Sequence, residues 1–280
     1  MSGGPVSILV VGDDQAHRVL AQRLVDAVLV KSAQRGWPEA EQLDQARRWY
    51  GPMDAPELAG WADGHYRAKN ARDDLRRVRM PSGRSPFLSR RAHGQAAVGD
   101  RSFDDIVQLA ALLKVPPDAL VMIRDTDGKG ERAIVSGALR DLNAERLMVL
   151  VLGMADPEAE AWVLVALTQP DPGRGEVLRT RLGFDPTRSP ERCTSSRDVP
   201  PGKAPRDAKR VLRYLTGEAE DLDTAPPDPL SPDVLEGLLL GLSEGLDRLK
   251  SAGEGCGLAQ FVFGLEQKLA PRVIGGPRRA

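Results

Sequence analysis

Residues 119–128 read Ala-Leu-Val-Met-Ile-Arg-Asp-Thr-Asp-Gly, and this stretch decides the fold that the sequence predicts. A short apolar run that ends in turn-forming residues is typical of a strand buried on both faces, as in parallel sheets. If strand geometry continues to Thr126, its two-residue period turns Asp125 and Asp127 to the same side. Two adjacent carboxylates suit a magnesium ion, although aspartate and glycine also form ordinary surface turns.

Two further apolar runs have the same arrangement. Residues 6–11 lead into Gly12 and a helix expected to reach about Ala33, and residues 146–152 precede another helix. Residues 131–143 read as a helix between two strands, which makes a parallel unit. We therefore predict an α/β fold, a mostly parallel sheet flanked by helices. The carboxyl ends of its strands would line one edge, where ligands of such sheets bind.

Carboxylates follow all three predicted strands at this edge. Clustered carboxylates repel one another unless a cation or a proton compensates them, so a divalent ion, magnesium or manganese, is the economical explanation. The candidate metal ligands are Asp125, Asp127 and Glu160, with Asp13 or Asp14 completing the site. Helix capping could also explain each carboxylate separately, and it is the simpler interpretation of Asp13 and Asp14. His17, one turn inside the first helix, could face the site or point to solvent, and we expect it to point to solvent.

Residues 37–101 differ in character from the rest and read as an insertion, with aromatic and charged residues interrupted by glycine and proline. Their second half is rich in arginine. Such a cluster can follow the phosphate backbone of a nucleic acid, or it can be a solvated surface loop. Lys203 and Lys209 could approach phosphate from the C-terminal part. The candidate nucleic-acid contacts are Arg76, Arg77, Arg90, Arg91, Lys203 and Lys209.

The remaining organisation follows from these assignments. Residues 1–36 and 102–168 would form the α/β core, and residues 169–280 a mainly helical extension that ends in helices over about 232–249 and 257–269. Their core candidates are Phe261, Phe263 and Leu265. Cys193 and Cys256 lie far apart without a partner pattern, so free thiols are expected rather than a disulfide or a zinc site.

Composition excludes some classes of protein. The formal net charge of −1 gives no global attraction to nucleic acid or membrane. The longest apolar segments are too short to span a bilayer, and the N-terminus lacks the basic start of a signal peptide, so we expect a cytoplasmic protein without a membrane partner.

Several segments, taken in order, resemble the Toprim fold, and in particular a bacterial family of Toprim-like proteins often encoded beside ATPases in phage-defence loci. The strand followed by Gly12-Asp13-Asp14 resembles the first Toprim motif, and residues 125–128 resemble its Asp-x-Asp motif. Residues 157–162, Pro-Glu-Ala-Glu-Ala-Trp, and the segments 207–212 and 255–261 are similar to further segments of that family.

The resemblance implies a magnesium-dependent phosphoryl-transfer enzyme, a nuclease in phage defence, and Asp13 or Asp14 could bring a shorter carboxylate to the region of that family's catalytic glutamate. One position departs from the pattern, because Toprim enzymes carry a glutamate immediately before the first-motif glycine and this chain has Val11. A general base must lie within hydrogen-bonding reach of its proton. The alternative is therefore a non-catalytic Toprim-like subunit that regulates or senses within an ATPase-containing defence complex.

Overall fold

The computed structural model describes residues 4–33, 42–62, 65–78, 102–126, 148–167, 171–195, 202–240 and 242–275. Its described part contains a six-stranded sheet in the order β3-β4-β1-β5-β6, with β2 pairing with β1 beside β4. All neighbouring strands are parallel except β3 and β4. The strands are β1 (Val6–Gly12), β2 (Arg47–Trp49), β3 (Trp61–Ala62), β4 (His65–Arg67), β5 (Ala119–Asp125) and β6 (Val149–Ala155).

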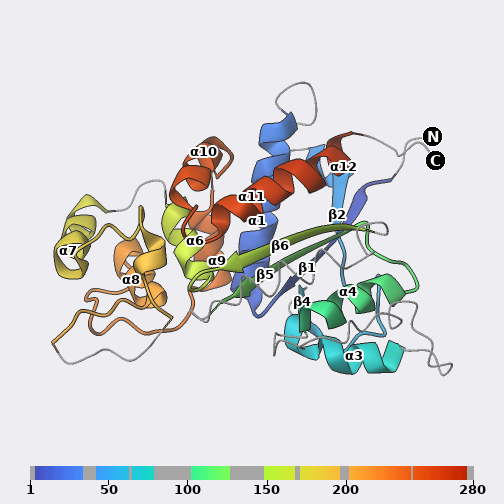
Figure 1. Cartoon of the computed structure of the whole chain (residues 1–280), viewed down its shortest axis with the longest axis horizontal. Coiled ribbons are helices and arrows are strands. Elements are labelled where there is room, and N and C mark those ends of the chain that lie inside the picture. The colour runs from blue at the N-terminus through green and yellow to red at the C-terminus, as the bar shows by residue number, and fades with distance from the viewer. Residues whose placement is uncertain are drawn as a thin grey trace, which may run out of the picture.

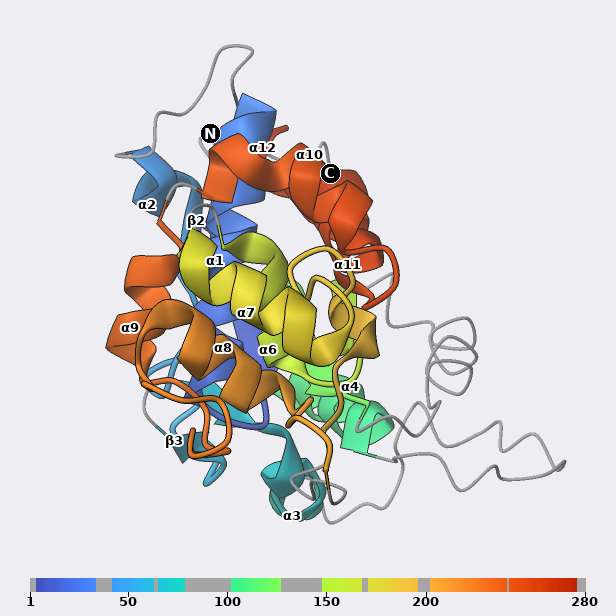
Figure 2. The same ribbon diagram turned by 90° about the vertical axis from the view of Figure 1, so that its left-hand side faces the viewer.

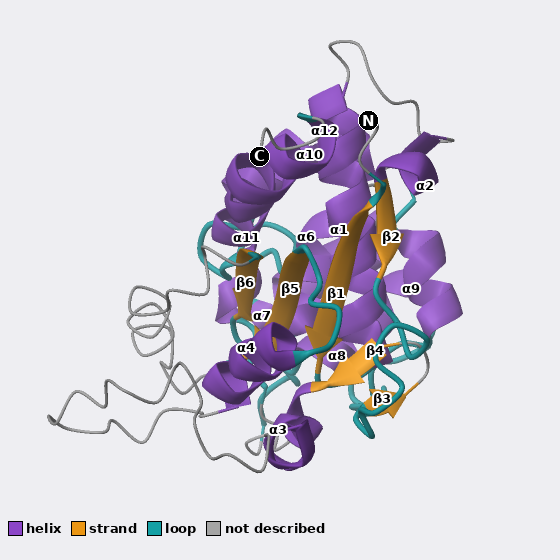
Figure 3. Cartoon of the chain, turned by 90° about the vertical axis from the view of Figure 1, so that its right-hand side faces the viewer, coloured by secondary structure: helices purple, strands orange, loops and turns teal. Residues whose placement is uncertain are grey.

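Helices cover both faces of this sheet (Figures 1 and 3), which confirms the predicted α/β class. The α-helices are α1 (Gln15–Ala33), α2 (Leu43–Ala46), α3 (Ala71–Val78), α4 (Ser102–Leu112), α6 (Ala159–Ala166), α7 (Pro172–Leu182), α8 (Ala208–Thr216), α9 (Pro232–Leu238), α10 (Leu242–Ala252), α11 (Leu258–Gly264) and α12 (Ala270–Ile274). Short 3₁₀ helices span Ala68–Asn70 and Pro190–Arg192, and a π-helical segment spans Leu265–Leu269. Among the described helices, none has the length and apolar character needed to cross a bilayer.

The middle of each central strand is an uninterrupted apolar run because each side of the sheet has its own core. Ile8 and Val10 of β1 belong to a cluster with α1, α6 and the C-terminal helices. Leu9 and Val11, which alternate with them, belong to a second cluster with α3 and α4. Successive side chains of a strand point to opposite faces, so a strand covered on both sides needs an uninterrupted apolar run.

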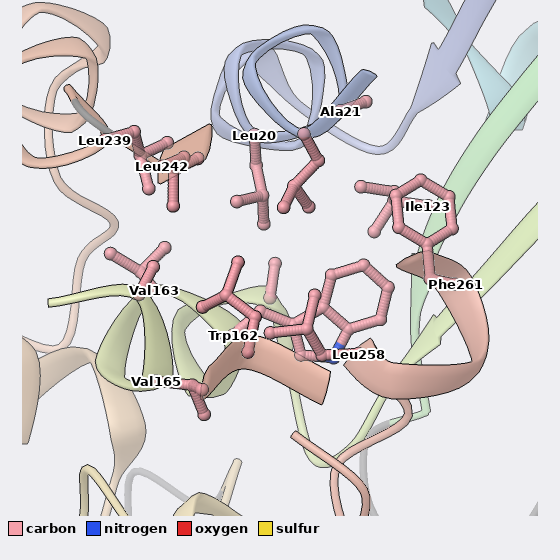
Figure 4. Close-up of a cluster of buried hydrophobic side chains, with 14 of the residues drawn as sticks. Leu20, Ala21, Ile123, Trp162, Val163, Val165, Leu239, Leu242, Leu258 and Phe261 are labelled. Atoms are coloured by element: carbon pink, nitrogen blue, oxygen red, sulfur yellow. The ribbon is translucent and has the colours of Figure 1, made fainter. Parts of the chain in front are cut away.

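The larger core joins α1, α6 and α11 on one face of the sheet (Figure 4). The Trp162 ring of α6 lies 5.1 Å from the Phe261 ring of α11, centroid to centroid, and its indole Nε1 donates a 2.8 Å hydrogen bond to the Cys256 carbonyl. A Cβ atom on Gly153 of β6 would lie 2.5 Å from Trp162. Glycine therefore lets the indole pack directly against the strand, and this packing fixes the start of α6 beside the end of β6.

The segments outside the predicted α/β core contribute to the same sheet and cores. Strands β2 and β4, from within residues 37–101, pair with β1. Helices α9, α10 and α12 contact α1, α8 packs on α6, and α7 packs on α8 (Figure 2). The helix predicted over residues 131–143 lies outside the described residues.

The last third of the chain corrects two expectations. The helix predicted over 232–249 is two helices, because α9 ends at Leu238 and α10 begins at Leu242, after Gly241. Phe261 and Leu265 are buried, but Phe263 is 59% exposed, so its assignment to the core was wrong. The physical reason is helical spacing: residues four apart share a face, whereas the residue midway between them points to the opposite side. The thiols of Cys193 and Cys256 are free, as predicted, and buried.

Candidate functional site

The carboxyl ends of β1, β5 and β6 lie side by side. The register pairs Val11 with Met122 and Asp125 with Ala155, so the three strands end at the same edge of the sheet. The turns after them therefore bring together the acidic segments that the sequence analysis singled out. This edge is the position at which open parallel sheets bind their ligands.

Asp125 is oriented by the alternation of β5. Ile123 packs in the core beside α1 and α6, and the two-residue period turns Asp125 to the same face and Arg124 to the other. Asp125 Oδ1 accepts a 2.8 Å hydrogen bond from the Ala159 backbone N–H, in the first turn of α6. A carboxylate at a helix N-terminus satisfies a free amide and meets the positive end of the helix dipole. Asp125 thus connects β5 to α6.

His17 links Asp125 to Asp14. Its Nδ1 lies 2.7 Å from Asp14 Oδ1 and its Nε2 lies 3.1 Å from Asp125 Oδ1. The residue is only 3% exposed, so the expectation that it points to solvent was wrong. Asp14 also accepts a 3.0 Å hydrogen bond from the His17 backbone N–H at the start of α1, which agrees with the predicted helix cap.

Gly12 makes room for this arrangement. A Cβ atom at position 12 would lie 2.5 Å from His17 Cβ, closer than two carbon atoms can approach without a shift. The imidazole can therefore reach β5 only because β1 ends in glycine. The contact between Asp14 and His17 had a signal in the sequence. The two residues are three positions apart at a helix start, a spacing that places their side chains on one face.

Electrostatics binds the three side chains together. Burial alone would raise the pKa of Asp14, but its hydrogen bonds to His17 and the charge of His17 hold that pKa well below its usual range. Burial alone would lower the pKa of His17, yet the two carboxylates raise it well above its ordinary value. Ionised carboxylates only accept hydrogen bonds, so both ring nitrogens carry a proton when His17 donates to both.

A second buried charge cluster lies at the start of α6. Lys209 Nζ of α8 donates a hydrogen bond to Glu158 Oε2 and lies 3.4 Å from Glu160 Oε2. Both glutamates are buried. Burial and the neighbouring Glu160 raise the pKa of Glu158 to about 7, and the pKa of Glu160 is raised by burial and by the charge of Asp125. The charge of Asp125, in the first cluster, thus acts on Glu160 in the second. Glu160, a candidate metal ligand, has Lys209 as its counterion.

The other predicted site residues have different surroundings. Asp13 lies on the side of Arg124, with 3.5 Å between its Oδ2 and Arg124 Nε. Asp127 lies outside the described residues. Val11, at the position of the Toprim glutamate, is fully buried in the core beside α3 and α4, where its strand neighbours are Tyr66 and Met122.

The candidate nucleic-acid contacts are spread over several elements. Arg76 and Arg77 are exposed on α3, and each pairs with an aspartate three residues earlier, at 3.4 and 3.3 Å. Lys203 is exposed, whereas Lys209 is held in the buried cluster with its side chain 14% exposed. Arg90 and Arg91 fall in the part of the chain that the structure does not describe.

Asp14 and Asp125 are the described carboxylates best arranged for a metal ion. Each engages His17 through Oδ1. Among the described residues, no three histidine, cysteine, aspartate or glutamate side chains gather as a metal site. One or two carboxylates, completed by water and phosphate, are the usual protein contribution to a magnesium site, so the donor chemistry fits. Comparisons of the chain with protein-family models, curated proteins and solved structures found no match.

Proposed function

We propose that this protein is a magnesium-dependent phosphoryl-transfer enzyme, a nuclease acting in phage defence. The observation that carries the proposal is the carboxylate pair: Asp14, in the turn after β1, and Asp125, at the end of the adjacent parallel strand β5, are linked through one imidazole at the carboxyl edge. The resemblance to Toprim-like proteins supplies the reaction class and the biological setting.

In this proposal, carboxylates bind the metal ion and arginines contact the nucleic acid. Asp125 and Asp14 would hold the ion, and Asp127 and Glu160 remain candidate ligands. A magnesium ion bound there supplies an activated water and stabilises negative charge on the departing oxygen. The exposed guanidinium groups of Arg76 and Arg77 would contact the phosphate backbone, which predicts binding that weakens with salt.

The test measures binding and cleavage with the same variants. Manganese binding is followed by electron paramagnetic resonance, and cleavage of plasmid DNA and single-stranded RNA is followed in magnesium and in manganese. Asp125→Asn should abolish cleavage and weaken manganese binding. Asp247→Asn, which removes one carboxylate from an exposed position of α10, should leave both unchanged. Absence of cleavage with either ion, or cleavage that survives Asp125→Asn, would contradict the proposal.

A second candidate function is a non-catalytic subunit of an ATPase-containing defence complex. Val11 favours it, because the position that carries glutamate in Toprim enzymes is a fully buried apolar one here. The pairing of Glu158 and Glu160 with Lys209 points the same way, since these carboxylates already have a cation. Co-expression with an ATPase of the kind often encoded beside Toprim-like proteins should then yield a stable complex that elutes together in size-exclusion chromatography. A chain that elutes alone would count against this function.

Val11→Glu tests whether position 11 can supply the glutamate of Toprim enzymes or is only a position of the apolar core. A glutamate there would put a carboxylate into the apolar core between the sheet and α3 and α4, and burying a charge among apolar side chains is strongly unfavourable. The variant should therefore lose stability and gain no cleavage. A gain of metal-dependent cleavage would mean that position 11 reaches the site after all.

A further inference from the structure

His17 is the group through which the two carboxylates of the site are held in place. Asp14 Oδ1 accepts hydrogen bonds from the His17 backbone N–H and from its ring Nδ1, at 3.0 and 2.7 Å. Asp125 Oδ1 is 3.1 Å from ring Nε2 and accepts a 2.8 Å hydrogen bond from the Ala159 N–H. One oxygen of each carboxylate therefore has two donors, and His17 supplies at least one of the two in both cases.

The imidazole itself has little freedom. It is 3% exposed, its Cβ lies against Gly12 at the end of β1, and its two nitrogens contact groups on two different elements, the start of α1 and the end of β5. A side chain with this many constraints defines the distance and the orientation of the groups it bonds.

We propose that His17 is a positioning residue that sets Asp14 and Asp125 for a divalent cation by hydrogen bonding to one oxygen of each. This inference rests on the proposed function, because it assigns a role toward the same ion. Partners that hydrogen-bond to metal ligands fix the ligands' orientation, and losing such a partner typically weakens metal affinity about 10–100-fold. His17 would contribute at that level without touching the ion.

The test compares two neutral substitutions, so that the loss of any imidazole charge is common to both. The amide nitrogen of His17→Gln can occupy the place of Nε2 and donate to Asp125. His17→Leu has a similar volume but no donor. The positioning role predicts that His17→Leu binds manganese about 10-fold or more weakly than His17→Gln, measured by electron paramagnetic resonance.

A control variant separates the positioning role of His17 from a general loss of stability in α1. Val19→Ala, which truncates another buried side chain of α1, should lower the melting temperature and leave manganese affinity at the wild-type value. If His17→Leu does not fold, His17→Asn replaces it, because its shorter side chain can reach Asp14 but not Asp125; it too should bind manganese more weakly than His17→Gln.

The outcomes separate the two proposals. Equal manganese affinity of the donor and non-donor variants, with the wild type binding, would overturn the role of His17 and leave the metal-dependent function standing. A wild-type protein that binds no manganese and cleaves no nucleic acid would overturn the proposed function, and the role of His17 with it.

Discussion

The buried Glu158 carboxyl leads to a prediction about pH that can be worked through numerically. Its side chain is 4% exposed, and no described residue donates a hydrogen bond to its Oε1. Burial and the charge of Glu160 raise its pKa from an ordinary 4.5 to about 7, although the contact with Lys209 acts in the opposite direction. At a pH between these two values, Glu158 therefore keeps a proton in the folded protein that it loses on unfolding.

The sign of the effect follows from this difference. Below the ordinary pKa both states are protonated and the group has no influence on stability. As pH rises through 4.5 toward 7, the unfolded state releases its proton first, so the folded state becomes progressively less stable. Each pH unit between the two pKa values corresponds to about 1.4 kcal/mol, which gives a loss of about 2–3 kcal/mol between about pH 5 and pH 8.

The substitution Glu158→Gln removes this dependence because glutamine stays neutral. Urea unfolding of both proteins at about pH 5 and pH 8, in chelator and at constant ionic strength, measures the difference in stability at each pH. We expect the glutamine variant to gain about 2–3 kcal/mol relative to wild type over this interval. Glu236→Gln, on the exposed surface of α9, should follow the wild type. A difference between wild type and Glu158→Gln that is equal at both pH values would refute the reasoning.

Three further predictions concern the packing around the site. Gly12→Ala places a methyl group against His17 and should cost about 1–3 kcal/mol of stability, as overpacking does; an unchanged melting temperature would mean that α1 moves aside freely. Trp162→Phe removes one of the two donors to the Cys256 carbonyl, which keeps the Asp156 N–H, and it leaves space where the larger indole packs; it should cost about 1–3 kcal/mol in chemical denaturation. Cys193 and Cys256 are buried, and burial raises the pKa of Cys193 to about 12, so a chromogenic disulfide reagent should react with neither thiol before unfolding and with both afterwards.

The parallel sheet was predictable because its strands are covered on both faces. Uninterrupted apolar runs such as residues 119–123 are needed only where both sides of a strand are buried, and each run is followed by a turn and then a helix or a long connection. The boundaries were less predictable. Residues 146 and 147 of the predicted run lie outside the described residues, and β6 begins at Val149. It continues through Gly153 and Ala155, small residues that the hydrophobic pattern does not mark as strand.

His17 and Lys209 were not predictable in their observed roles, because each meets its partners through tertiary structure. Lys209 is 51 positions from Glu158 in the chain, and only the packing of α8 on α6 brings them together. A lysine in a short basic helix is ordinarily solvated, and nothing local distinguishes this one. His17 had a local signal toward Asp14, but its contact with Asp125 spans 108 positions and depends on the register of β1 and β5.

Position 11 illustrates how strand alternation limits what the carboxyl edge can contain. Val11 turns toward α3 and α4, whereas Gly12, directly after it, faces His17 and α1. The carboxylates of Asp14 and Asp125 belong to the same side as Gly12, through His17 and Ala159. A further carboxylate that lies on the same side as Asp14 and Asp125 would therefore have to come from the turn after β1, and not from position 11 of the strand. If the proposed function holds, Asp14 is therefore a more informative position to mutate than Val11, because its carboxylate lies on the side of the sheet that carries His17 and Asp125.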